Sequence, residues 1–257
     1  MKSKTYYYKS YTDDFAVTKD IHPISIDDNY VYEPKNPFFK IYSFLVYFLL
    51  AKPIAWTILK VRYGYHVKNK KVLKECKHKG YFLYGNHTNY MPDAFVSNVI
   101  SPRRNSIIVG NQTVSIKGIQ TTVKALGAIP LGDTFKAKKN FMKCVNHKIE
   151  KNQSVMIFPE AHIWPYYTGV RPFDPSTLKY PTMLNTPVYT ISLCYSKRKM
   201  INRPKITAYI DGPFYPDNNL GNKEKIDKLY NEVYNTMVNR CKEYSTYSIH
   251  QYIKQES

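Results

Sequence analysis

Two side chains in the first half of the chain have the types and spacing of a general-base pair. His87 and Asp93 follow the apolar run Tyr81–Tyr84, and five residues separate them. A carboxylate that accepts an imidazole N–H fixes the tautomer and makes the other ring nitrogen more basic. That nitrogen can take a proton from a substrate hydroxyl as the hydroxyl attacks an acyl carbonyl. The spacing alone is more typical of a loop histidine beside a helix-capping aspartate.

A third candidate lies in the second half of the chain, where Glu160 follows the apolar run Val155–Phe158 through Pro159. If the two apolar runs are neighbouring strands, the Pro-Glu turn brings a second carboxylate close to His87. The sequence has no Ser or Cys in a nucleophile-elbow motif, so direct attack by the substrate hydroxyl is the simpler scheme.

The elements that would position these residues are short apolar runs alternating with amphipathic ones. Such alternation predicts an α/β fold with a central, largely parallel mixed sheet flanked by helices. The expected strands are 81–84, 106–109, 128–131, 155–158, 188–193 and 206–210, and the expected helices are 92–101, 116–126, 134–150 and 222–242. In helix 134–150, we expect Phe135, Met142, Val145 and Ile149 to form the buried face.

His87 is predicted to lie in the loop between a strand and a helix. Pro92 suits the first turn of a helix, and Asp93 would lie beside it in that turn. Met91 precedes the proline and is therefore biased toward an extended conformation. The loop can then fold back so that Asp93 accepts the imidazole N–H.

The N-terminal part divides into a polar leader, residues 1–37, and an apolar stretch, residues 38–63, ahead of an α/β domain over 64–257. We expect the leader to be extended and weakly ordered. The run 41–51 is shorter than the roughly 20 residues that span a bilayer, and Lys52-Pro53 interrupts it. The pattern predicts two helices that meet near Pro53 and dock in the membrane interface, with Trp56 at headgroup depth. A buried helical hairpin is the alternative.

The net charge indicates the kind of binding partner, and the cysteine content indicates the cellular compartment. A formal net charge of +19 favours an anionic partner such as an anionic lipid surface or a phosphorylated substrate. The four cysteines are widely spaced, with no C-x-x-C pair, which argues against a zinc ribbon and fits a reducing compartment. Residues 1–34 do not resemble a signal peptide. We therefore expect a peripheral or monotopic protein on the cytoplasmic face of a membrane.

Four segments in order along the chain carry a family resemblance: Asn86-His87 with Asp93, then Gly127-Ala128-Ile129-Pro130, Phe158-Pro159-Glu160, and Pro187-Val188. Over about residues 80–212 the chain resembles the glycerolipid acyltransferases, which include 1-acylglycerol-3-phosphate acyltransferases. The resemblance implies transfer from an acyl thioester, acyl-CoA or acyl-carrier protein, to a hydroxyl of glycerol 3-phosphate or a lysophospholipid. It implies His87 as base, Asp93 as its partner, Glu160 as an acceptor-binding residue, and no cofactor or metal.

The sequence departs from the family pattern at three points. Five residues, rather than four, separate His87 from Asp93, which a loop can absorb. Ala161, His162 and Ile163 replace the usual Gly, Thr and Arg after Pro-Glu, and the arginine that commonly follows the Gly-Ala-Ile-Pro strand is missing. Other residues must therefore hold the phosphate of the acceptor. The predicted substrate-binding set is Glu160, Arg171, Asn86, Thr88, Lys136 and Lys139.

Two alternatives belong to other functional classes. A metal-dependent hydrolase would use His87, Asp93, Glu160 and His162, since nitrogen and oxygen ligands suit several divalent ions. A basic nucleic-acid-binding protein would use the net charge and the 25 tyrosines. The chain lacks a recognisable nucleic-acid motif and carries an apolar stretch that such a protein does not need. We therefore expect no nucleic-acid partner.

Overall fold

A computed structural model describes residues 1–16, 21–76 and 78–255. Its centre is a seven-stranded sheet in which only β7 (Val188–Ser196) and β8 (Lys205–Phe214) pair antiparallel. The strand order is β2-β8-β7-β3-β6-β4-β5, with β2 His66–Lys68, β3 Tyr81–Gly85, β4 Asn105–Val109, β5 Ala128–Pro130 and β6 Ser154–Ile157. The predicted α/β fold with a largely parallel mixed sheet is confirmed.

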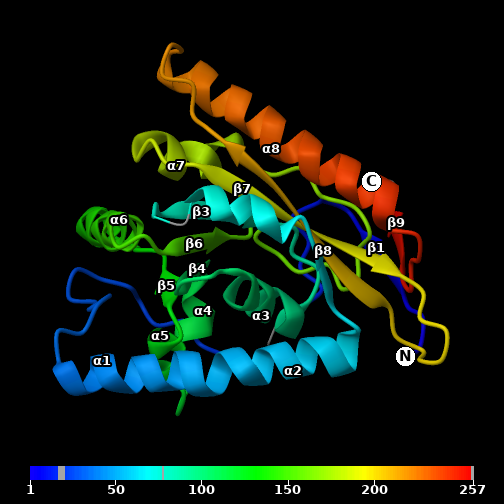
Figure 1. Cartoon of the computed structure of the whole chain (residues 1–257), viewed down its shortest axis with the longest axis horizontal. Helices are drawn as coiled ribbons and strands as arrows, with labels where there is room; N and C mark the ends of the chain where they lie inside the picture. Colours follow the sequence, from blue (N-terminus) through cyan, green and yellow to red (C-terminus); the bar gives the residue numbers. More distant parts are fainter. Residues whose placement is uncertain (17–20, 77, 256–257) are drawn as a thin grey trace.

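Helices cover both faces of the sheet (Figure 1). One face carries α3 (Tyr90–Ile100) and the N-terminal helix, and the other carries α6 (Phe135–Glu150) and α8 (Asn222–Tyr244). Strand β3 supplies Leu83 to the first core and Phe82 to the second, so it is buried on both sides. The other short α-helices are α4 (Asn111–Val114), α5 (Gln120–Ala125) and α7 (Lys179–Met183). Two 3-10 helices, η2 (Lys70–Cys76) and η3 (Pro175–Leu178), are also present.

Two helix predictions differ from the structure. Of the predicted helix 116–126 only Gln120–Ala125 (α5) is helical, because Gly118 has a left-handed φ of 83° that keeps the preceding residues out of the helix. In α6 the buried face includes Phe141 and Val145, while Phe135 is 87% exposed. Phe135 is the first residue after the capping Thr134, so its side chain projects beyond the core.

The apolar stretch forms one continuous helix, not the two that were predicted. It runs through α1 (Pro37–Phe44), a π-helical segment η1 (Leu45–Ala51) and α2 (Lys52–Tyr63). The Lys52 amide donates to the Tyr47 carbonyl five residues earlier. Pro53 lacks an N–H, and this wider π-type turn carries the helix past it without a break. We call residues 37–63 the base helix.

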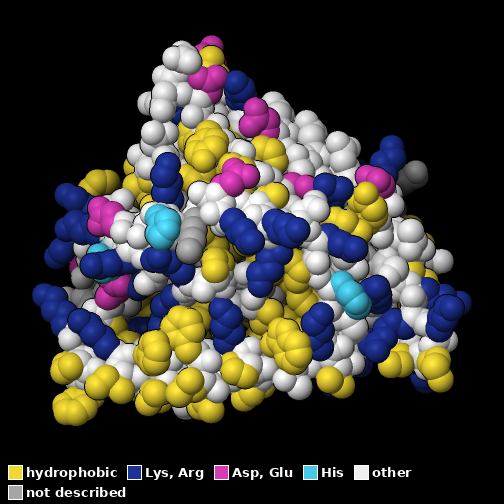
Figure 2. Space-filling model, viewed as in Figure 1, with side chains coloured by type: hydrophobic (Ala, Val, Ile, Leu, Met, Phe, Trp, Pro, Cys, Tyr) yellow, Lys and Arg dark blue, Asp and Glu magenta, His cyan; other side chains and the backbone are white. Residues whose placement is uncertain are grey.

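One side of the base helix packs on the domain, and the other is apolar and exposed. Its buried residues recur about once per turn: Ser43, Tyr47, Ala55, Leu59 and Tyr63. The Tyr47 hydroxyl accepts from the Asn105 amide, and the Lys52 ammonium donates to the Ser101 carbonyl. The opposite side exposes Phe38, Ile41, Phe44, Leu49, Leu50, Ile54, Trp56 and Val61. In Figure 2 hydrophobic side chains line this base, and lysine and arginine side chains form a band above it.

The leader and the C-terminal tail are more ordered than predicted. Strand β1 (Thr5–Tyr8) pairs in parallel with β9 (Gln251–Lys254), so the segment after α8 is not a frayed end. Farther along the leader, Ile26 is fully buried, and its amide donates to Asp133. Residues 17–20 of the leader lie outside the described residues. The leader therefore acts as part of the α/β domain, and its contacts reach the candidate site.

Candidate active site

His87 lies in the loop between β3 and α3, at the carboxyl edge of the parallel strands. Strand β3 ends at Gly85, and α3 begins at Tyr90, two residues earlier than predicted. Pro92 and Asp93 therefore occupy the first turn of α3, as expected. Acidic groups are favourable at this end of a helix because the helix dipole is positive there.

Asp93 holds the His87 ring in a defined orientation. Its Oδ2 lies 2.8 Å from Nδ1 of His87 and also accepts the backbone amides of Thr88 and Asn89, at 2.7 and 2.8 Å. Asp93 is 1% exposed. Burial raises the pKa of the Asp93 carboxyl, while the hydrogen bond from His87 and the two amides oppose that rise. A carboxylate in this position makes Nδ1 the protonated nitrogen and leaves Nε2 as a base.

Apart from its contact with Asp93, the His87 ring packs against an aromatic side chain and is partly open to solvent. The Phe158 ring stacks on His87 with centroids 4.4 Å apart and planes 18° apart. The His87 side chain remains 17% exposed. Within the described residues, no protein group forms a hydrogen bond with Nε2. The ring is therefore held by protein on one side and is open to a substrate hydroxyl at Nε2.

The loop that carries His87 is fixed by buried hydrogen bonds to β7. The Asn86 side chain exchanges two hydrogen bonds with the backbone of Leu193, and the Tyr195 hydroxyl contacts both Thr88 Oγ1 and the Asn89 amide group, at 2.6 and 2.9 Å. Asn86 and Thr88 have no exposed surface. In this structure their polar groups hold the loop, and substrate binding by Asn86 and Thr88 stays a prediction.

Glu160 and Arg171 form a second pair, buried beside the first. Both side chains are 0% exposed, and Arg171 Nε and Nη2 donate to Glu160 Oε2 at 3.0 and 2.8 Å. The Arg171 amide also donates to Glu160 Oε1. Burial raises the pKa of the Glu160 carboxyl, and the Arg171 guanidinium acts against this rise. In this structure each is satisfied by the other without access to solvent, and substrate binding by Glu160 and Arg171 stays a prediction.

The leader closes over this buried pair. The Tyr11 carbonyl accepts from Arg171 Nη1, and the Asp13 carbonyl accepts from Trp164 Nε1, at 3.0 and 2.8 Å. The Trp164 ring lies 5.0 Å from the Arg171 guanidinium and stacks on Tyr252 of β9. The buried arginine thus receives backbone oxygens in addition to its carboxylate, which is what a buried charge requires.

The remaining predicted residues do not converge on His87. The Lys136 and Lys139 side chains are exposed in the first turns of α6, and Lys136 lies 3.8 Å from Asp28. His162 turns toward Asp14, with Nδ1 3.3 Å from its carboxylate. Among the described residues, no group of three His, Cys, Asp or Glu side chains gathers as a potential metal site.

Three residues of the site were not predicted: Phe158 against the His87 ring, Tyr195 beneath the loop, and Trp164 over Arg171. Phe158 stands in the quoted Phe-Pro-Glu motif, so its position two residues before Glu160 was a usable signal. Tyr195 was outside the predicted strand 188–193, which ends three residues too early. The contacts of Trp164 join parts of the chain 151 positions apart and leave no local pattern.

Comparison with known proteins gives a family and a fold. A family model described as Acyltransferase matches residues 64–194, about half of the chain. No curated protein matches the chain. A crystal structure of PlsC, the 1-acyl-sn-glycerophosphate (LPA) acyltransferase from Thermotoga maritima, superposes with a TM-score of 0.56 at 15% sequence identity. The match covers 82% of this chain and 89% of that chain, and it establishes similarity of fold.

Proposed function

This chain belongs to the acyltransferase family, and we propose that it transfers a fatty acyl group from an acyl thioester to a glycerol-phosphate hydroxyl. The acceptor that we propose is lysophosphatidic acid, and the product is phosphatidic acid, which places the enzyme in phospholipid synthesis. The observation that carries the proposal is the hydrogen bond of 2.8 Å between His87 Nδ1 and the buried Asp93 carboxylate, which leaves Nε2 open.

The proposed reaction needs a single proton transfer at each end. The acceptor hydroxyl attacks the thioester carbonyl while its proton moves to Nε2 of His87. The tetrahedral intermediate then collapses, the C–S bond breaks, and the thiolate takes the proton from the imidazolium. Asp93 stabilises the imidazolium and keeps the ring in place through both steps. No cofactor is required in this scheme, and acyl-CoA or acyl-carrier protein is a substrate.

We propose that the base helix docks this site on a membrane. Its 27 residues are long and apolar enough to cross a bilayer. The recurring buried side of the helix, however, packs along the domain, so the exposed apolar side faces one direction over its full length. Such a helix lies in the interface with its apolar side among the acyl chains. Trp56 and the basic band in Figure 2 then lie at headgroup depth.

The proposed location is the cytoplasmic face of a membrane, with the protein held peripherally or as a monotopic protein. The net charge of +19 supports attraction to anionic lipid. With Glu160 and Arg171 buried together, Lys136 and Lys139 remain as the exposed predicted residues for the acceptor phosphate, and this role stays a prediction.

Acyl transfer by the purified full-length chain in mixed micelles tests the proposal. Labelled acyl-CoA and acyl-carrier-protein donors would be offered with glycerol 3-phosphate, lysophosphatidic acid and lysophospholipids with larger head groups. We expect transfer to lysophosphatidic acid by the wild type and none by His87→Ala. Transfer to another acceptor would correct the substrate, and transfer by folded His87→Ala would contradict the mechanism. Salt-dependent nucleic-acid binding without any transfer would favour the binding-protein alternative.

A further inference from the structure

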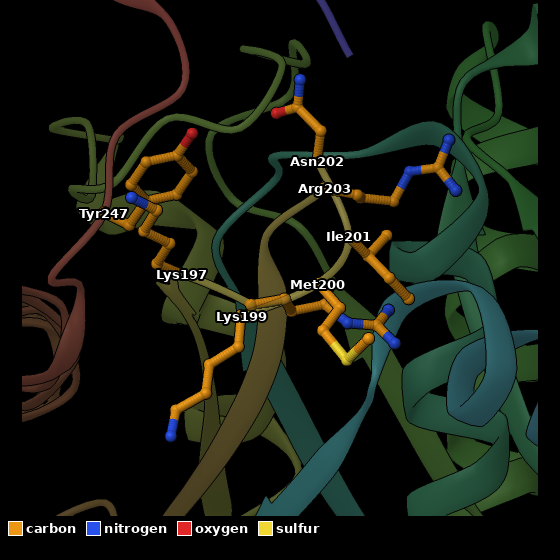
Figure 3. Close-up of a pocket in the computed structure, with 8 residues that line it drawn as sticks. Lys197, Lys199, Met200, Ile201, Asn202, Arg203 and Tyr247 are labelled. Atoms are coloured by element: carbon orange, nitrogen blue, oxygen red, sulfur yellow. The ribbon is translucent and has the colours of Figure 1, made fainter.

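A polar pocket lies outside the active site, in the turn between β7 and β8. It has a volume of about 260 Å³. We call it the β7–β8 pocket. Figure 3 shows its lining side chains spreading from one turn of the backbone, with Lys197 alongside the Tyr247 ring. The lining residues are Lys197, Arg198, Lys199, Met200, Ile201, Asn202, Arg203 and Tyr247.

Four cations and no carboxylate line this pocket. Among the described residues, no carboxylate lies within 4.0 Å of these four cations, although other lysines and arginines of the chain form such pairs. The Nε of Arg203 is buried and has no hydrogen-bond partner in the described structure. A buried N–H of a charged group without an acceptor is costly. The pocket therefore carries an excess of positive charge that an anion can offset.

The β7–β8 pocket adjoins the end of the base helix. Arg198 Nη1 donates to the Arg62 carbonyl at 3.1 Å, and the Arg203 guanidinium lies 5.5 Å from the Tyr63 ring. Both partners belong to the last turn of α2. The pocket thus extends the positive band at the end of the apolar surface.

The tip of the same turn is apolar. Met200 is 95% exposed and Ile201 is 46% exposed, although basic residues flank them in sequence. In Figure 2 hydrophobic side chains line the base of the molecule and occur again at the corner where Figure 1 places this turn. Exposed apolar side chains surrounded by lysine and arginine are typical of segments that enter the headgroup region of a membrane.

We propose that the β7–β8 pocket binds the phosphate of an anionic phospholipid in the membrane on which the base helix docks. The four cations around the turn supply the positive charge, and Met200 and Ile201 enter the acyl-chain boundary beside that lipid. The bound lipid gives the protein a second contact at the α2 end and fixes its rotation on the surface. This inference rests on the proposed membrane docking and not on the acyl-transfer chemistry.

Vesicle co-sedimentation of the full chain tests this inference without any turnover. The probes are phosphatidylcholine vesicles and mixed phosphatidylcholine–phosphatidylglycerol vesicles. Lys197→Gln/Lys199→Gln removes two exposed cations at the turn and should lower partitioning onto mixed vesicles by about 30-fold. The matched control, Lys223→Gln/Lys242→Gln, removes two exposed cations from α8 on the opposite side of the sheet, and we expect a change of less than about threefold. Partitioning onto phosphatidylcholine alone should be unchanged in both.

A second variant tests the built part of the pocket. Arg203→Gln removes one charge and the buried Nε, and we expect it to lower partitioning onto mixed vesicles by at least about fivefold. Equal partitioning of the turn and α8 double variants would overturn the proposal. So would a wild type without preference for mixed vesicles, even if it transfers acyl groups in micelles.

The same variants separate a membrane lipid from the phosphate of the acceptor. Soluble glycerol 3-phosphate should not displace the wild type from mixed vesicles, and the KM for acceptor in micelles should stay the same in the turn variant. Displacement by glycerol 3-phosphate, or a raised acceptor KM with unchanged vesicle partitioning, would show that the pocket serves the acceptor and would overturn the lipid assignment.

Discussion

Two hydrogen-bonded pairs of side chains follow the carboxyl ends of the neighbouring strands β3 and β6. In the first, Asp93 is buried and His87 is 17% exposed, with Nε2 unpaired. In the second, Glu160 and Arg171 are both 0% exposed, and main-chain carbonyls of Tyr11 in the leader and of His162 accept two further guanidinium N–H groups. Similar chemistry therefore has different consequences: the open pair, His87 and Asp93, can exchange a proton with a substrate, whereas the sealed pair, Glu160 and Arg171, has no access to solvent here and joins distant parts of the chain.

The largest expected effect is on kcat, and it comes from substituting Asp93, the buried residue of the open pair. Asp93→Asn should lower kcat by about 10³- to 10⁴-fold with little change in KM, because an amide does not stabilise the imidazolium or select the Nδ1–H tautomer. Steady-state kinetics in micelles measure this. Glu33→Gln is the control, since the half-buried Glu33 lies 3.7 Å from His147 and also pairs with Lys148, away from His87, and should leave kcat unchanged. Equal losses in both variants would contradict a special role for Asp93.

The sealed pair should respond in stability. Arg171→Met leaves the Glu160 carboxylate buried without its partner, and we expect the free energy of unfolding to fall by about 3–5 kcal/mol. Adding Glu160→Gln removes the uncompensated charge and should recover a large part of that loss. Urea unfolding followed by circular dichroism measures both changes. The partly exposed Arg240–Asp211 pair offers a control, because Asp211→Asn should cost less than Arg171→Met. A negligible change in the free energy of unfolding for Arg171→Met would contradict the structural role of the sealed pair.

The smallest effect concerns the leader that covers the sealed pair. Trp164→Phe keeps most of the aromatic packing but loses the Nε1 hydrogen bond to the Asp13 carbonyl. We expect a loss of about 1 kcal/mol in the free energy of unfolding, with transfer activity retained. A loss of transfer without a loss of stability would mean that this covering segment takes part in substrate binding.

The sequence was sufficient to predict the contact between His87 and Asp93, because the residues that determine it are close together in the chain. Pro92 marks the first turn of α3, Gly85 ends a buried strand, and His87 and Asp93 are joined by the loop between them. The apolar runs predicted the sheet strands β3 to β8, since a strand buried on both faces reads as a continuous apolar segment. The three-residue β2 was too short to give such a signal.

The sealed pair and its cover depend on contacts between distant segments. Arg171 was selected for the loop that it shares with Glu160, but the leader residues that help to bury it lie about 160 positions away. The pairing of β1 with β9 joins the two ends of the chain, and neither strand has a strong apolar pattern. At Pro53 the local rule predicted a helix break, and a π-helical segment carries the helix past the proline instead. Tertiary packing decided these features.

Acyl transfer by two folded variants in mixed micelles tests the difference between the pairs most directly. His87→Ala removes the open base, and Glu160→Gln/Arg171→Met neutralises the sealed pair; circular dichroism would first establish that both are folded at the assay temperature. We predict that His87→Ala loses at least about 10³-fold in kcat, while the double variant keeps more than roughly a tenth of wild-type turnover. Turnover by His87→Ala, or a folded double variant without turnover, would contradict the assignment of catalysis to the open pair and structure to the sealed one.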